Sequence, residues 1–201
     1  MPASPPPRPP GISYLRPRIR PIGACVRGDH PARMNTASSP VRRGHAALRR
    51  GRASAPGQVY HLTAVTCGRR AYFAGFDVAC AAVRGFLQPT ALADARLLAW
   101  VLMPDHAHWL LQLQHEPLGS VVGRMKSASG VHANRVLART GPVWEPAFHD
   151  HALRRDEDLR SVARYIIANP VRAGLVDRPG DYPFWDCIWM QEPAASPPPL
   201  L

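Results

Sequence analysis

The sequence predicts an α+β domain in which helices lie on one face of an antiparallel sheet. Three observations support this fold class. Short segments with the alternation of β-strands are interspersed with longer segments of helical periodicity. A turn signal at Pro104 and Asp105 connects two of the strand segments directly. The resulting order, β-α-β-β-α-β-α, is that of a ferredoxin-like, split βαβ arrangement followed by an additional C-terminal helix.

Four segments are expected to form strands. Residues 58–66 alternate apolar side chains on one side with β-branched side chains on the other. Residues 96–103 and 106–114 are apolar runs of strand length, which the intervening turn would join as a hairpin. Residues 144–153 should form the fourth strand, near an edge of the sheet, because Pro146 cannot donate a backbone hydrogen bond to a neighbour.

Three segments are expected to form helices, at residues 76–87, 117–137 and 156–168. Each carries apolar residues at helical spacing. The last segment has acidic residues in its first turn and a single apolar face, and Pro170 should end it.

The charge of the chain is concentrated near one end. The 201 residues carry a formal net charge of +11, and residues 1–57 account for +10 of it. This segment is also rich in proline and poor in aromatic and β-branched residues, a composition that favours disorder. We therefore expect a disordered tail at 1–57, one folded domain at 58–190 and a disordered, Pro-rich tail at 191–201. Met34 offers an alternative start of the chain.

The densest basic cluster adjoins the predicted domain and comprises Arg42, Arg43, Arg49 and Arg50. A mobile Arg-rich arm can neutralise phosphates and strengthen sequence-independent binding to DNA. A compositional bias explains the same residues without a function, because Lys126 is the only lysine among the 25 basic residues. Both interpretations remain open at the level of the sequence.

Cysteine usage and hydropathy argue against several classes of protein. No apolar run approaches the roughly 18 residues of a membrane span, and the N-terminus lacks the apolar segment of a secretory signal. The cysteines stand far apart without a C-x-x-C pair, which argues against a disulfide framework and a thiolate zinc site. We expect reduced thiols in a cytoplasm. The four cysteines are Cys25, Cys67, Cys80 and Cys187.

His106 and His108 lie two residues apart in a predicted strand. Such positions point to the same face and are about 6.5 to 7 Å apart, so the two imidazoles can converge on one metal ion. Ala107 between them would turn toward the opposite, packed face. Histidines with a role only in packing or hydrogen bonding would also explain the pair, so the spacing alone does not establish a metal site.

His149 and His151 form a second pair with the same spacing. The residue between them, Asp150, is charged, so both faces of this strand would be polar. An edge or solvated strand explains the pair without a ligand role, and we expect no metal there.

Tyr165 and Asn169 are four residues apart in the last predicted helix, which places them on one face. A phenol hydroxyl and an amide oxygen would therefore emerge side by side. Taken alone, Tyr165 fits a half-buried aromatic residue and Asn169 a helix C-cap before Pro170. A functional role depends on their combination with the histidines.

Four segments carry a family resemblance: QVYHLTAVTCGRRAYF, WVLMPDHAHWLLQL, GPVWEPAFHDHAL and RYIIANPVRAGLVDRPGDYPFWD. In this order and at these distances they resemble the IS200-type tyrosine transposases, and most closely the branch of REP-associated tyrosine transposases. The resemblance covers about residues 44–190, and its MPDHAH and YIIANPVRAGLV segments are specific to that family. One departure is Asp105, where Asn is commoner in this branch.

The resemblance implies a bacterial DNA transposase of the HUH class, a nuclease and strand-transferase acting on single-stranded or hairpin DNA. By that resemblance His106 and His108 would bind a divalent cation, Asn169 would complete the metal site, and Tyr165 would be the catalytic nucleophile on the C-terminal helix. Two imidazoles and an amide oxygen favour Mg²⁺ or Mn²⁺, and Zn²⁺ is also compatible with them. The expected product is a 5′-phosphotyrosine and a free 3′-OH.

Two other functions remain open. One is a non-catalytic nucleic-acid-binding module of ferredoxin-like shape, and the other is a metal-dependent hydrolase that uses water, with Tyr165 only structural. The intact set of four candidate residues favours the transposase. The sequence leaves the oligomeric state open between a monomer and a homodimer.

Overall fold

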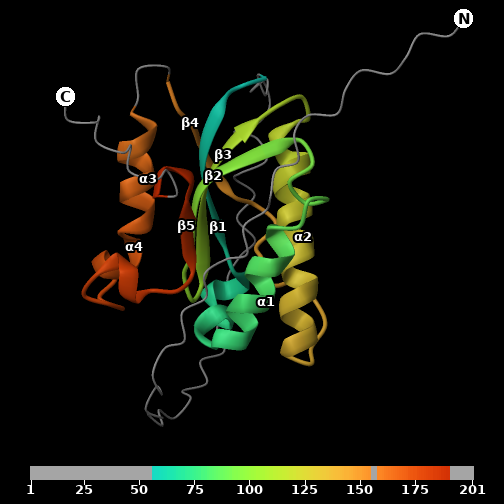
Figure 1. The fold of residues 1–201 in the computed structure, drawn as a ribbon. Helices are drawn as coiled ribbons and strands as arrows, with labels where there is room; N and C mark the ends of the chain where they lie inside the picture. The colour runs from blue at the N-terminus through green and yellow to red at the C-terminus, as the bar shows by residue number, and fades with distance from the viewer. Residues whose placement is uncertain (1–55, 155–157, 191–201) are drawn as a thin grey trace, which may run out of the picture.

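The structure, a computed structural model, describes residues 56–154 and 158–190 (Figure 1). Most of the predicted N-terminal tail and the whole C-terminal tail lie outside the described residues. The alternative start at Met34 and the basic cluster of Arg42, Arg43, Arg49 and Arg50 also lie outside them. Within the described ranges, no helix is long and apolar enough to cross a membrane. The three cysteines described are free thiols: Cys67, Cys80 and Cys187.

Five strands form one sheet in the order β4-β1-β3-β2-β5, and every neighbouring pair is antiparallel. The first four strands confirm the ferredoxin-like arrangement, in which β3 lies between β1 and β2. The short β5 extends the sheet beside β2 and has no counterpart in the sequence prediction. The strands are β1 (Val59–Val65), β2 (Ala95–Leu102), β3 (His106–Leu113), β4 (His149–Ala152) and β5 (Trp185–Cys187).

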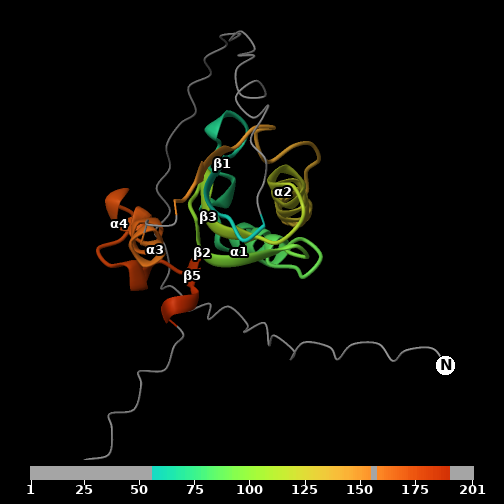
Figure 2. The ribbon, with the colours of Figure 1, turned by 90° about the horizontal axis from the view of Figure 1, so that it is seen from above.

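Helices cover both faces of the sheet rather than one, which corrects the sequence prediction (Figure 1, Figure 2). Helices α1 and α2 pack together on one face, and α3, followed by the short α4, lies on the other. Two separate hydrophobic clusters, one on each face, show the same division. The helices are α1 (Phe76–Phe86), α2 (Leu118–Val136), α3 (Leu159–Ile167) and α4 (Asn169–Arg172).

The alternation of side chains along β3 decides which face each residue reaches. Trp109 packs in the cluster that contains α1 and α2, whereas Leu110 packs in the cluster that contains α3. Since successive side chains point to opposite faces, His106 and His108 share the α3 face with Leu110. Ala107 between them is fully buried on the α1–α2 face, as the sequence predicts.

The fourth strand is shorter than the sequence predicts. Only four residues form β4, and Trp144 makes just an isolated bridge with Thr66. Pro146 lies between this bridge and the strand, where its missing N–H cannot contribute to continuous pairing. The prediction of an edge position is confirmed, because β4 ends the sheet beside β1.

The last predicted helix is divided into α3 and α4. Asp158 caps the start of α3 by accepting a hydrogen bond from the backbone N–H of Arg160 at 2.9 Å. Pro170 does not end the helical path, which corrects the sequence prediction. It lies in the first turn of α4, where a proline N–H is not needed, and Ala168 at the junction keeps a right-handed helical conformation.

Candidate active site between the sheet and helix α3

His106 and His108 form the centre of the candidate site. Both side chains are half-buried, and their ring centroids are 5.0 Å apart with the ring planes nearly perpendicular. In each histidine, Nε2 can bind a metal ion only while this nitrogen is unprotonated. The hydrogen bonds made by the other nitrogen, Nδ1, therefore decide whether the pair is suited to a cation.

Asp105 orients the His106 ring. Its Oδ1 lies 2.6 Å from His106 Nδ1, and its Oδ2 lies 3.4 Å from a guanidinium nitrogen of Arg69. Burial alone would raise the pKa of the Asp105 carboxyl, but the His106 hydrogen bond and the charges of His106 and Arg69 lower it. A carboxylate that accepts from Nδ1–H leaves Nε2 of His106 with a free lone pair.

Strand β1 holds the His108 ring. Thr63 stands opposite His108 in the β1–β3 pairing, and its Oγ1 lies 3.0 Å from His108 Nδ1. His61 Nε2 lies 3.3 Å from the same nitrogen. Burial, and then the charges of His106, His61 and Arg172, lower the pKa of His108 to about 3. His108 is therefore neutral at physiological pH, as a metal ligand must be.

Tyr165 lies on α3 above this histidine group. Its ring meets the His61 ring edge-on, with centroids 6.3 Å apart, and the residue is 49% exposed. Ala163 and Ile166 on the same helix are buried against the sheet, which fixes the helix in place. The guanidinium of Arg172 lies over the Tyr165 ring, 4.1 Å from its centroid. The structure thus brings Tyr165 to the same side of the sheet as the histidines.

Asn169 has a capping role in the structure. Its Nδ2 donates to the carbonyl oxygens of Tyr165 (3.2 Å) and Ile166 (3.0 Å), so its Oδ1 is the atom left for another partner. Among the described residues, no hydrogen bond joins Asn169 to His106 or His108, and no three His, Cys, Asp or Glu side chains form a metal-binding group. A cation held by the two imidazoles would need a ligand of another kind, which an amide oxygen fits.

His149 and His151 lie on the same face of the sheet as the first pair. The β1–β4 register places His149 opposite Thr63 and His151 opposite His61, and directly opposed side chains share a face. Both are exposed on the edge strand. Burial and then the charge of His151 lower the pKa of His61.

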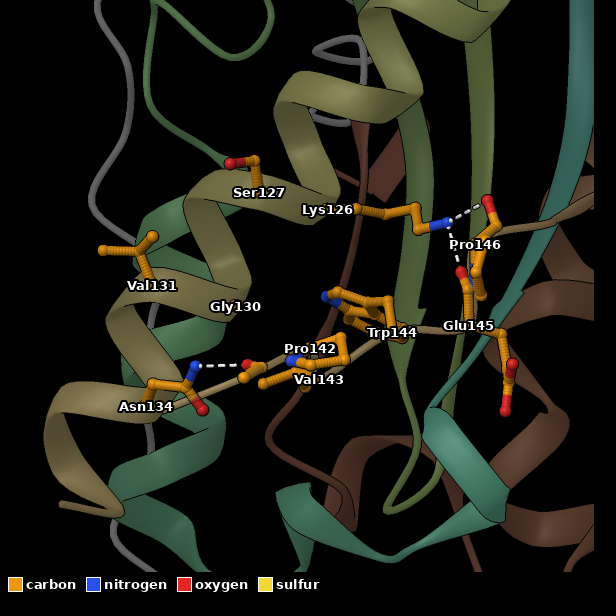
Figure 3. Close-up of a pocket in the computed structure, with 11 residues that line it drawn as sticks. Lys126, Ser127, Gly130, Val131, Asn134, Pro142, Val143, Trp144, Glu145 and Pro146 are labelled. Atoms are coloured by element: carbon orange, nitrogen blue, oxygen red, sulfur yellow. Dashed lines mark hydrogen bonds between the residues drawn. The ribbon is translucent and has the colours of Figure 1, made fainter. Parts of the chain in front are cut away.

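A surface pocket lies apart from these residues, between α2 and the loop of residues 141–146 (Figure 3). Lys126 of α2 donates to the carbonyl oxygens of Glu145 (2.6 Å) and Pro146 (3.0 Å), which fastens the loop to the helix. None of the residues that line the pocket is a histidine or a tyrosine. We assign this contact a structural role.

Comparison with known families decides the family of the chain. A family model described as "Transposase IS200 like" matches residues 55–169, which is more than half of the sequence. The chain belongs to the IS200-like transposase family. The matched segment contains the paired histidines, Tyr165 and Asn169.

Two relatives and one solved structure are similar to this IS200-like transposase. The chain is 34% identical over 88 residues to a REP-associated tyrosine transposase of Escherichia coli, and 31% identical over 98 residues to a protein of Haemophilus influenzae named for the same class. Each match covers 43% of this chain and about half of the relative, 50% and 56% respectively.

The solved structure is a REP-associated tyrosine transposase bound to a REP hairpin. It has 23% sequence identity and a TM-score of 0.52, and the match covers 74% of this chain and 82% of that one. At this level of identity the match shows a shared fold.

Three residues that contact His108 or Tyr165 in the candidate site were not predicted from the sequence: His61, Thr63 and Arg172. A sequence signal exists for the first two, because they are polar side chains two apart in a strand whose other side is apolar. Their contact with His108 depends on the register of β1 against β3, which no local sequence pattern determines. Arg172 lies beyond the proline that was expected to end the helix.

Proposed function

We propose that the chain is a metal-dependent single-strand DNA nuclease and strand-transferase, which acts on hairpin or repeat DNA through a 5′-phosphotyrosine intermediate. One observation carries the proposal: Tyr165, half-exposed on α3, stands edge-on to a histidine group that includes His108. Family membership and the hairpin bound to the REP-associated transposase of similar fold support the choice of DNA as substrate.

The proposed nucleophile is the Tyr165 hydroxyl. An unperturbed phenol has a pKa near 10 and is a weak nucleophile at neutral pH, so the phosphate must be activated as well. His106, His108 and Asn169 would hold a divalent cation, Mg²⁺ or Mn²⁺, which when bound polarises a non-bridging phosphate oxygen. The free Nε2 of His106 and the neutral state of His108 fit these residues to such a cation.

The residues around the proposed ligands keep them in place. With Nε2 of each histidine binding a cation, the Nδ1–H groups would donate to Asp105 Oδ1 and Thr63 Oγ1, and such outer contacts fix the orientation of a ligand. Tyr165 is half-exposed, so a single strand can reach this residue without opening the core.

In the proposed reaction the Tyr165 oxygen forms a bond to phosphorus as the bond from phosphorus to the 3′ oxygen breaks. The phenol loses one proton to solvent, and the 3′ oxygen takes one up, so protons balance. Because the phosphodiester energy is kept in the phosphotyrosine bond, a 3′-OH can reverse the step on another strand without ATP.

The proposal also gives a role to the basic cluster, which comprises Arg42, Arg43, Arg49 and Arg50. We assign it sequence-independent contacts to DNA phosphates, because Arg-rich segments next to a nucleic-acid-binding domain add electrostatic affinity.

Detection of a covalent adduct tests the proposal. The protein is incubated with Mg²⁺ or Mn²⁺ and end-labelled single-stranded hairpins, and labelled protein that survives denaturing electrophoresis is measured. We expect an adduct with the wild-type protein and none with Tyr165→Phe. Tyr72→Phe is the matched control, because Tyr72 packs beside Arg139 away from the histidines.

Two outcomes would overturn the proposal. Cleavage without any adduct would indicate a hydrolase that uses water. Hairpin binding with neither cleavage nor adduct would indicate a non-catalytic binding module.

A further inference from the structure

Arg172 occupies an unusual place beside the proposed nucleophile. It ends α4, seven residues after Tyr165, and its backbone N–H donates to the carbonyl of Ala168 at 3.0 Å. The helical path from α3 to α4 therefore nearly continues, and positions seven apart return to the same face. This places the Arg172 side chain over Tyr165.

The contact between the two side chains is close. The Arg172 guanidinium carbon lies 4.1 Å from the centroid of the Tyr165 ring, well within the range of a cation–π interaction. The guanidinium therefore lies directly against the ring of the proposed nucleophile.

The guanidinium has no carboxylate partner in the part of the chain that the structure describes. Arg164, one residue before Tyr165, differs in this respect because it pairs with Asp158 at 3.4 Å. An exposed arginine stacked on a phenol ring keeps its hydrogen-bond donors free, and their planar fork matches the oxygens of a phosphate.

The position of the donors fits the reacting phosphate. In-line attack requires phosphorus about 3 to 3.5 Å from the phenol oxygen. The Arg172 guanidinium lies over the ring that carries this oxygen. Its N–H groups are therefore within reach of a phosphate bound at the hydroxyl. A fixed positive group at this place stabilises the charge that grows on the non-bridging oxygens.

We propose that Arg172 is a catalytic residue that binds a non-bridging oxygen of the phosphate attacked by Tyr165. This inference rests on the proposed function and adds a residue to it. Arg172 stays protonated throughout: the bond from the Tyr165 oxygen to phosphorus forms, the bond to the 3′ oxygen breaks, and no proton passes through the guanidinium.

A neutral phosphate analogue tests this role. The linkage that the wild-type protein cleaves is first mapped and then replaced by a methylphosphonate, in which a methyl group takes the place of one charged oxygen. Single-turnover rates of adduct formation are measured on both linkages for the wild type, Arg172→Gln and the control Arg164→Gln. Thermal unfolding of each variant confirms that it is folded.

On the phosphodiester we expect Arg172→Gln to lower the rate about 10²- to 10³-fold, the usual loss for one donor to a transition-state oxyanion. On the methylphosphonate, Arg172→Gln should lower the rate by less than about tenfold, because less negative charge develops on the phosphorus oxygens for Arg172 to neutralise. The rates of Arg164→Gln should stay near those of the wild type on both linkages. A purely structural role for Arg172 predicts the same loss on both linkages, and that result would overturn the inference.

Different results would refute the proposed function and the role of Arg172. Without an adduct from the wild-type protein, the proposed function is wrong and the role of Arg172 falls with it. With a wild-type adduct and equal losses on both linkages, only the role of Arg172 is wrong.

Discussion

Thr63 Oγ1 lies 3.0 Å from His108 Nδ1, across the pairing of β1 with β3. The orientation of one proposed metal ligand is therefore set by the neighbouring strand. His61, two residues earlier on β1, approaches the same nitrogen at 3.3 Å. When His108 binds a cation through Nε2, Nδ1 carries the single proton of the ring, and these two residues compete for it.

Replacement of Thr63 by Val tests this relationship. Valine keeps the shape and removes the acceptor, so we expect the affinity for Mn²⁺, measured by isothermal titration calorimetry, to fall about 10- to 100-fold. Thr90→Val, in an exposed loop, is the control and should bind Mn²⁺ as the wild type does. An unchanged affinity in Thr63→Val would mean that Thr63 does not orient the ligand.

The two histidine pairs should differ in metal binding. We expect His106→Ala to abolish binding of Mn²⁺ and metal-dependent cleavage, because it removes one of two imidazole ligands. His151→Ala should keep most of both, because His151 is exposed on the edge strand β4. Paramagnetic resonance of Mn²⁺ and the cleavage assay provide the two measurements. The opposite pattern would place the metal at the β4 pair.

Gly85 should be essential for the packing of α1 against α2. A Cβ atom at this position would lie 2.6 Å from the backbone Cα of Ser129, so the two helices would have to separate. We expect Gly85→Ala to lower the free energy of unfolding by about 1 to 3 kcal/mol, the usual cost of overpacking. Urea unfolding measures this loss.

Gly123 on α2 is the matched control, because a Cβ there meets nothing within 4 Å. Gly123→Ala should raise the free energy of unfolding by roughly 0.5 to 1 kcal/mol, since alanine loses less backbone entropy than glycine in a helix. Equal effects of the two substitutions would show that the close helix contact is not formed.

The basic N-terminal segment should supply affinity without sequence selectivity. Deletion of residues 1–33 should leave cleavage intact, whereas deletion of residues 1–55 should flatten the dependence of log K on log salt. Each lost phosphate contact lowers that slope by about 0.7 for a single strand. Fluorescence anisotropy with a hairpin and a scrambled hairpin measures both quantities. Lost discrimination with an unchanged slope would instead indicate a segment that reads bases.

Local sequence patterns were sufficient to predict most of the fold. Alternation and helical periodicity located β1, β2, β3, α1 and α2, and the split βαβ order followed from them. The face on which α3 packs was not predictable in this way, because it depends on which side of the sheet α1 and α2 leave uncovered. The three residues of β5 were also missed, because so short a segment shows no alternation.

The candidate site was also only partly predictable from local sequence patterns. The spacing of His106 and His108 predicted that they share a face, and the structure confirms it. The Tyr165–Asn169 spacing predicted a common helix face. Asn169 lies at the start of α4, and its Nδ2 caps the end of α3 by donating to the carbonyls of Tyr165 and Ile166. The contacts of His61 with His108 and Tyr165 join three separate elements, and no local pattern contains them.

The central claim is that Tyr165 forms the covalent bond to DNA, and mapping of the adduct tests it most directly. The adduct formed with a single-stranded hairpin is digested with a nuclease and then with trypsin, which cuts after Arg164 and Arg172 and releases residues 165–172 with Tyr165 as the only tyrosine. Tandem mass spectrometry should find the 5′-linked nucleotide on Tyr165 in this peptide. A nucleotide on any other residue, in an adduct formed by the folded wild-type protein, would contradict the account.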